Sequence, residues 1–117
     1  MVSMTSLSLM ISIKVNGGYT GSGTYNANKI LAQEAIVLEA GKYIISNKAT
    51  GTYNDNLPVY NLELRNADNT ALDRVIAVKP NESVTLELSE ARHLGATYIS
   101  CGKTLTTNFD CVVYPMI

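Results

Sequence analysis

The sequence predicts an all-β protein, an antiparallel Greek-key-like β-sandwich or jelly roll of about seven or eight strands. Several segments alternate strictly between apolar and polar residues, and turn signals separate them. Charged residues make up only 16% of the chain, against about 25% in a typical globular domain. The 117 residues, 46% of them hydrophobic, predict one domain over residues 1–117 with a core of its own.

The N-terminal region combines a predicted strand with a predicted arm. Residues 6–15 place Leu, Ile and Val on one face and Ser, Met and Lys on the other, which is typical of a half-buried strand. Residues 1–5 carry no turn signal that would fold them back. They are therefore expected to extend as an arm onto a neighbouring subunit or assembly, through Val2 and Met4. The alternative is one long edge strand within a monomer.

Residues 16–28, with the sequence NGGYTGSGTYNAN, predict a long exposed loop. Four glycines and three asparagines favour turns over regular structure. Tyr19 and Tyr25 are the two residues of this loop suited to contact a ligand. The GxxGxG spacing of residues 18–23 matches neither the dinucleotide-binding pattern nor a phosphate-binding loop.

Residues 29–40 allow two interpretations. Good helix formers at helical spacing, followed by Gly41, are compatible with a helix. The alternative is a strand near residues 34–39, a turn at Ala40-Gly41 and a second strand over residues 42–47. The strand interpretation is preferred because IVLEAGKYIIS at 36–46 resembles VTLEL…LGATYIS at 84–100, whose first part alternates as a strand does.

The second half of the chain reads as short strands and turns. Strands are predicted at residues 59–65, 71–78, 84–88, 96–101 and 111–117. Turns are predicted at residues 66–69 and at 79–83, where Pro80 suits the second position. The SEARHLG segment predicts one helical turn with Ser89 as N-cap and Gly95 past its end. That turn would leave His93, the chain's single histidine, on the surface.

The LGATYISC segment resembles the tyrosine corner of Greek-key sandwiches. The resemblance implies that the ring of Tyr98 packs on the core and that its hydroxyl bonds to backbone between Glu87 and His93. The match is partial, because Tyr98 lies three residues before Cys101 instead of two. Cys101 itself is predicted to be a core residue of its strand.

Cys101 and Cys111 flank a nine-residue segment, GKTLTTNFD, and are expected to face each other across its base. A disulfide and a pair of free thiols are both compatible with this spacing. Synthesis in a reducing cytoplasm favours free thiols. The start of the chain has no positively charged residue before its apolar part, so no signal peptide is predicted.

The composition argues against several kinds of chemistry. A blue-copper site needs two imidazoles, a structural zinc site needs four clustered ligands, and the chain has one histidine and two cysteines. We therefore predict no catalytic residue, no cofactor and no metal site. The net charge of −1 without a basic stripe argues against nucleic acid as a partner. No apolar run reaches the roughly 18 residues of a membrane helix, so no membrane partner is expected.

In size and composition the chain resembles phage capsid cement and decoration proteins, although it shares no specific motif with them. The resemblance implies a non-enzymatic, virion-associated structural protein. Such a protein would form a homo-oligomer, expected to be a trimer, and would bind a capsid through its N-terminal arm and sheet edges. The alternative is a small carbohydrate- or protein-binding module that uses the loop at residues 16–28.

Overall fold

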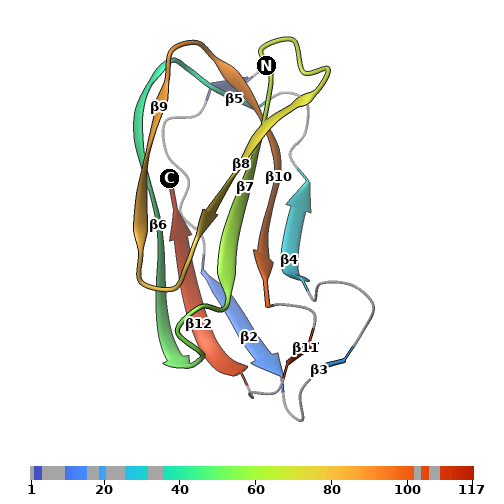
Figure 1. The fold of residues 1–117 in the computed structure, drawn as a ribbon, viewed down its shortest axis with the longest axis vertical. Helices are drawn as coiled ribbons and strands as arrows, with labels where there is room; N and C mark the ends of the chain where they lie inside the picture. The colour runs from blue at the N-terminus through green and yellow to red at the C-terminus, as the bar shows by residue number, and fades with distance from the viewer. Residues whose placement is uncertain are drawn as a thin grey trace.

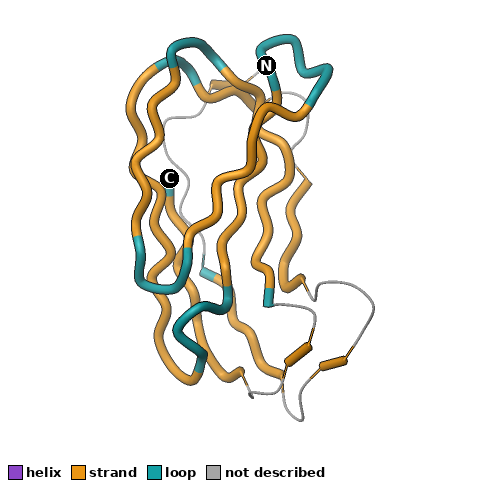
Figure 2. Tube along the Cα trace, in the orientation of Figure 1, coloured by secondary structure: helices purple, strands orange, loops and turns teal. Residues whose placement is uncertain are grey.

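The protein is a two-layer β-sandwich (Figure 1). The computed structural model describes residues 2–3, 10–15, 19–20, 26–31, 36–101, 104–105 and 109–117. Within these ranges every regular element is a strand and no helix occurs (Figure 2). The predicted all-β sandwich is therefore confirmed.

One layer, called sheet A here, has the strand order β1-β5-β10-β7-β8, and β4 also pairs with β10. Its strands are β1 (Val2–Ser3), β4 (Asn26–Leu31), β5 (Ile36–Leu38), β7 (Val59–Arg65), β8 (Leu72–Val78) and β10 (Arg92–Ser100). All of these pairs are antiparallel except β1 with β5, which is parallel. Two strands pair with the same edge of β10: β5 pairs with its beginning and β4 with its later part.

The other layer, called sheet B here, has the antiparallel order β2-β12-β6-β9. Its strands are β2 (Ile11–Val15), β6 (Gly41–Thr52), β9 (Ser83–Leu88) and β12 (Phe109–Met116). Two further short strands, β3 (Tyr19–Thr20) and β11 (Thr104–Leu105), pair with each other at one end of the sandwich (Figure 1). The described residues form twelve strands, three of them only two residues long, which is more than the seven or eight predicted.

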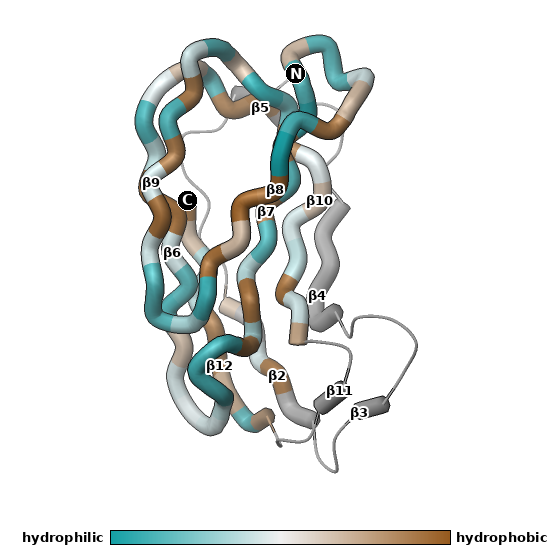
Figure 3. The backbone as a smooth tube through the Cα atoms, in the orientation of Figure 1, coloured by the Kyte–Doolittle hydropathy of each residue, from teal (hydrophilic) through white to brown (hydrophobic). Residues whose placement is uncertain are grey.

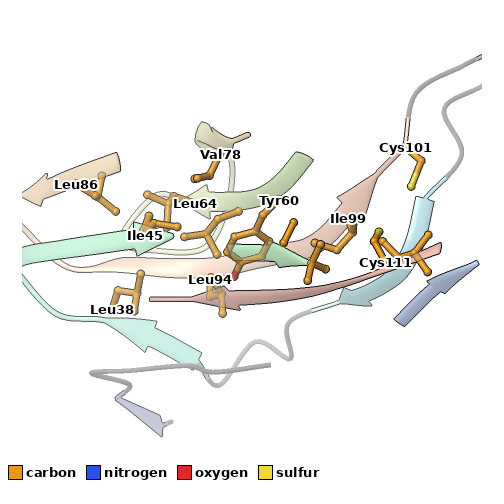
Figure 4. Close-up of a cluster of buried hydrophobic side chains, with 14 of the residues drawn as sticks. Leu38, Ile45, Tyr60, Leu64, Val78, Leu86, Leu94, Ile99, Cys101 and Cys111 are labelled. Carbon is orange, nitrogen blue, oxygen red and sulfur yellow. The ribbon is translucent and has the colours of Figure 1, made fainter. Parts of the chain in front are cut away.

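The core lies between the two sheets and is built by strand alternation. In β7, Tyr60, Leu62 and Leu64 are buried, and they face the inward residues of sheet B. The cluster also receives side chains from β5, β6, β9, β10 and β12, some of which are drawn in Figure 4. Hydrophobic stretches, brown in Figure 3, accordingly recur along β6, β8 and β9. Burial of these side chains supplies the main driving force for folding.

The chain crosses between the sheets as a paired ribbon at the end opposite β3 and β11. Strand β5 in sheet A continues into β6 in sheet B, and β9 in sheet B continues into β10 in sheet A. The register pairs Leu38 with Arg92 before the crossing and Gly41 with Leu88 after it. The two segments that resemble each other in sequence thus run side by side, and the predicted strands within residues 36–47 are confirmed. The turn predicted at Ala40-Gly41 is instead the point where the chain passes from one sheet to the other, because β5 and β6 do not pair with each other.

The predicted helical turn at SEARHLG is wrong. Strand β10 begins at Arg92, and His93 pairs with Val37 of β5 and Arg65 of β7. Strand pairing on both sides satisfies the backbone of this segment, and this tertiary pairing outweighs the local helix signals. Gly95 does not end a helix. It lies at a register shift, where a Cβ atom would come within 2.9 Å of the Glu63 Cβ atom.

The predicted loop at residues 16–28 also needs correction. Strand β3 lies inside this range, and β4 begins at Asn26, two residues before the range ends. The pairing partners of both strands, β11 and β10, lie more than 60 residues further along the chain. A local abundance of Gly and Asn does not reveal such distant pairing.

The two turns predicted from the second half of the chain are confirmed. The β7–β8 hairpin turns through Asn66 to Asn69, whose φ is 60°. In the β8–β9 turn the Glu82 N–H donates to the Lys79 carbonyl at 3.1 Å, which places Pro80 at the second position as predicted. Asn81 follows with φ of 61°, the positive value that a type II turn requires at its third position.

Asn47 and Asn81 fasten this turn to sheet B. The buried Asn47 side chain donates from Nδ2 to the carbonyls of Pro58 and Val78, both at 3.0 Å. The Asn81 Oδ1 atom accepts from the Ala49 N–H, also at 3.0 Å. One residue of β6 thereby bonds to the end of β8 and to the segment preceding β7. This polar link between the sheets was not predicted from the sequence.

Candidate interaction surface

The large hydrophobic side chains that remain exposed gather in two places. Among the described residues they are Met10, Ile44, Leu72, Val75 and Met116. Leu72 and Val75 belong to β8, and the other three lie on the outer face of sheet B or at its border. Single exposed apolar residues are normal on soluble proteins, whereas grouped ones mark contact surfaces.

Strand alternation and register bring Ile44 and Met116 close together. In β6, Ile45 points into the core and Ile44 points outward with 63% of its surface exposed. Met116 of β12 lies opposite Ser46 of β6, two residues along the strand from Ile44, and is 46% exposed. Residues in this diagonal relation on one sheet face are within reach of each other when their side chains are long.

Met10 extends the same group across the sheet. It directly precedes β2, where Ser12 is exposed and Ile13 is buried, so alternation places Met10 on the outer side. The pairing of Ile11 with Val113 puts Met10 level with the half-buried Tyr114 of β12. We call Met10, Tyr114, Met116 and Ile44 the sheet B stripe.

Few charges interrupt this face. The register sets Lys42 opposite Glu87, so one pair of opposite charges lies directly across two strands. Lys48 lies opposite Tyr114, and Asp110 is exposed on the same face near the start of β12. The remaining exposed positions of β9 on this face are Ser83 and Thr85. An apolar stripe flanked by neutral and balanced polar residues suits contact with another protein surface.

The second exposed group lies on β8, an edge strand of sheet A among the described residues. Asp73 there accepts from Arg74 at 2.8 Å and from Arg92 of β10 at 3.1 Å. Hydrogen bonds from Arg74 and then Arg92 lower the pKa of the Asp73 carboxyl. Charged residues and a register shift on an edge strand discourage pairing with other chains, so β8 is the better protected of the two groups.

Of the four predicted contact residues, the structure describes Val2 and Tyr19, which lie in different sheets. Val2 lies in β1, where it pairs with Ile36 of the same chain, and Ser3 pairs with Val37. Tyr19 lies in β3, at the opposite end of the sandwich (Figure 1). Met4 and Tyr25 lie outside the described residues. In this single chain residues 2–3 belong to sheet A and residues 11–15 to sheet B, so they do not form one continuous edge strand.

The tyrosine-corner hydrogen bond is observed at Tyr43 in the first of the two similar segments. The Tyr43 hydroxyl donates to the Glu39 carbonyl, four residues upstream, at 2.7 Å, and its ring packs against the core. Tyr98 is half-buried in the middle of β10, opposite Asn61, and alternates with the buried Thr97 and Ile99. This mid-strand place differs from the strand entry that the corner implies. The bond predicted for its hydroxyl stays a prediction.

Cys101 and Cys111 are both free thiols and both buried, and Cys101 lies in the core as predicted. Burial, together with the charge of the neighbouring Cys111, raises the pKa of Cys101 to about 11. Burial and the nearby Asp110 carboxylate also raise the pKa of Cys111. Both shifts keep the thiols protonated, and hence weakly nucleophilic, at neutral pH.

The described residues contain no group of three or more His, Cys, Asp and Glu side chains placed to hold a metal ion. None of the described elements is a helix long and apolar enough to cross a membrane. No protein-family model, curated protein or solved structure matches the chain.

The sequence analysis missed the sheet B stripe and Asn47. The sequence did contain one sign of the stripe. The outward-facing positions of β6 are otherwise mostly polar, and Ile44, between the inward residues Tyr43 and Ile45, is an apolar exception. Asn47 gave no such signal, because its carbonyl partners lie 11 and 31 residues away.

Proposed function

We propose that the protein is a non-enzymatic structural protein that attaches to a larger protein assembly, as a virion cement or decoration protein does. The attachment surface in this proposal is the sheet B stripe. The observation that carries it is the grouping of Met10, Ile44 and Met116 on one sheet face with few charges. Burying such side chains against another protein gains about 25 cal/mol for each Å² of apolar surface removed from water.

The stripe favours a protein surface over other occupants. The exposed charges described on its sheet face are one cross-strand pair, Lys42 with Glu87, and the separate Lys48 and Asp110. A nucleic acid would instead require clustered positive charge, and the whole chain carries a net charge of −1. The partner we propose is the outer surface of a capsid shell, with the protein itself present as a homo-oligomer.

The N-terminal arm is a second contact element in this proposal. Its described part, Val2–Ser3, pairs with β5 over only two residues. So short a parallel pairing is readily exchanged for a partner in another subunit. The stripe and the arm can be tested separately, because they lie on different sheets.

Co-sedimentation tests the proposal. The purified protein is mixed with a panel of purified phage heads that lack their own decoration protein, and bound protein is separated on a gradient. We expect the unmodified protein to sediment with heads and the double variant Ile44→Ser/Met116→Ser to lose binding by at least tenfold. The matched control, Leu72→Ser/Val75→Ser on β8, should bind as the unmodified protein does.

Two results would count against the proposal. Equal binding by the stripe variant and the β8 control would remove the stripe as the attachment surface. Failure to bind any head, combined with retention of the protein on a glycan array, would favour the alternative of a carbohydrate-binding module that uses residues 16–28.

A further inference from the structure

We propose that Cys101 and Cys111 form an intramolecular disulfide on exposure to a small-molecule disulfide oxidant, and that this bond links the two sheets. The inference does not depend on the attachment function proposed above. It concerns the end of the sandwich that carries β3 and β11, whereas the crossing ribbon lies at the other end (Figure 1).

The two thiols come from opposite layers of the sandwich. Cys101 directly follows β10 of sheet A, whereas Cys111 lies in β12 of sheet B, opposite Ile13 and Gly51. Cys101 has no exposed surface, Cys111 is 4% exposed, and both belong to one packed cluster. Figure 4 shows their sulfur atoms pointing toward one another at one end of that cluster. A bond between facing sheets through a sandwich core is the arrangement of the immunoglobulin disulfide.

The reaction is a thiol–disulfide exchange with a reagent such as oxidised glutathione. The thiolate of one cysteine attacks a sulfur of the reagent and releases one molecule of reduced thiol, leaving a mixed disulfide. The second cysteine then attacks the protein-bound sulfur and displaces the other half. In sum, two protein thiols lose two electrons and two protons, and one disulfide molecule becomes two thiols.

Burial sets the rate of this exchange. The thiolate is the attacking form, and both cysteines are shielded from solvent and from the reagent. The first attack therefore requires a transient opening of this end of the sandwich. We expect oxidation to be slow in buffer and faster at a urea concentration just below the unfolding transition.

The bond would close a short ring that contains β11. Strand β11 pairs with β3, so the ring contains the strand that pairs with Tyr19 and Thr20. In the chain-entropy model a loop of about 10 to 15 residues lowers the unfolding equilibrium constant on the order of a hundredfold. The oxidised protein should therefore unfold at a clearly higher urea concentration than the reduced protein.

The test uses the full chain, purified under reductant and incubated with glutathione at graded ratios of oxidised to reduced form. Samples are unfolded in the presence of an alkylating reagent and weighed by mass spectrometry. The expected result is paired loss of both alkylation sites in a monomer two hydrogen masses lighter, reversed by dithiothreitol. Cys111→Ala should instead give a single glutathione adduct or an unmodified thiol.

Either of two results would overturn the inference. One is that both thiols remain fully alkylated at the most oxidising ratio, with and without sub-denaturing urea. The other is that oxidation yields only glutathione adducts or covalent dimers. The mass measurement on the unmodified chain stands even if the alanine variant does not fold.

Discussion

At the scale of single residues, Asn47 of β6 links the two layers of the sandwich through its side-chain amide. Its Nδ2 atom donates to two carbonyls that belong to different segments, and the residue is fully buried. Removing the amide would leave the carbonyls of Pro58 and Val78 without this donor in the interior. A buried acceptor that loses its partner costs about 1–3 kcal/mol.

We therefore expect Asn47→Ala to lower the free energy of unfolding by about 2–4 kcal/mol. Urea denaturation followed by tyrosine fluorescence measures this change. Asn56→Ala is the matched control, because Asn56 is exposed and should shift stability by no more than about 0.5 kcal/mol. Equal stability of the two variants would show that the Asn47 bonds do not hold the sheets together.

Tyr60 is a second residue with a measurable consequence. Its hydroxyl is buried without a hydrogen-bond partner among the described residues, and burial raises the pKa of Tyr60 from 10.0 to about 12. Between these two values the unfolded chain loses a proton that the folded chain keeps. The unfolded state then binds fewer protons, so stability falls as pH rises. The raised pKa of Cys101 acts in the same direction, beginning near pH 9.

Tyr60→Phe removes the hydroxyl whose raised pKa lowers the stability at high pH. At neutral pH we expect the variant to be as stable as the unmodified protein or more stable by about 1 kcal/mol, because an unpartnered buried hydroxyl is lost. Near pH 11 its advantage should grow by about 1.4 kcal/mol, the free energy that corresponds to one pH unit above the unfolded pKa. Urea midpoints at about pH 8 and 11 measure both values. A constant difference between them would contradict the assigned burial.

At the scale of elements, strands with strict alternation were predictable and strands defined by distant pairing were not. Strand β7 has the predicted bounds, Val59–Arg65, because its sequence alternates and turns flank it. The start of β10 was missed because Ser89 and Gly95 are spaced as helix caps are, while the deciding contacts come from β5 and β7. The sequence drew attention to Tyr98 alone, whereas Tyr43 in the first of the two similar segments also donates a hydrogen bond to backbone upstream of it. The bond predicted for Tyr98 stays a prediction.

The role of the N-terminal arm in attachment can be tested independently of the sheet B stripe. Deletion of residues 1–5 removes β1, whose pairing with β5 covers two residues, so the sandwich should still fold. We expect the circular dichroism spectrum to remain that of a β protein while the native mass falls to that of a smaller oligomer or a monomer. Light scattering coupled to gel filtration measures the mass.

The full-length double variant Val2→Asn/Met4→Ser is the control for this deletion. It keeps the backbone available for strand pairing and changes only the side chains. It therefore separates binding of the arm by strand pairing from binding by the packing of its side chains. If the truncated protein keeps the native mass and the head binding of the intact chain, the arm is not a connector between subunits.

At the scale of the whole molecule, the sandwich extends 43 × 27 × 18 Å and separates its candidate contacts in space. The stripe occupies the outer face of sheet B, β1 and β5 lie at one end, and β3 with β11 lie at the other (Figure 1). The fold class followed from patterns within single strands. The position of the stripe did not, because it depends on the register between β2, β12 and β6.

Methionine oxidation tests the attachment surface most directly, because Met10 and Met116 are natural probes of it, 71% and 46% exposed. The protein is treated with dilute hydrogen peroxide alone and after binding to phage heads, and sulfoxide formation at each methionine is followed by peptide mass spectrometry. Burial of the stripe predicts that both residues oxidise at least severalfold more slowly in the bound protein. Unchanged oxidation rates of Met10 and Met116 in protein that sediments with the heads would contradict attachment through sheet B.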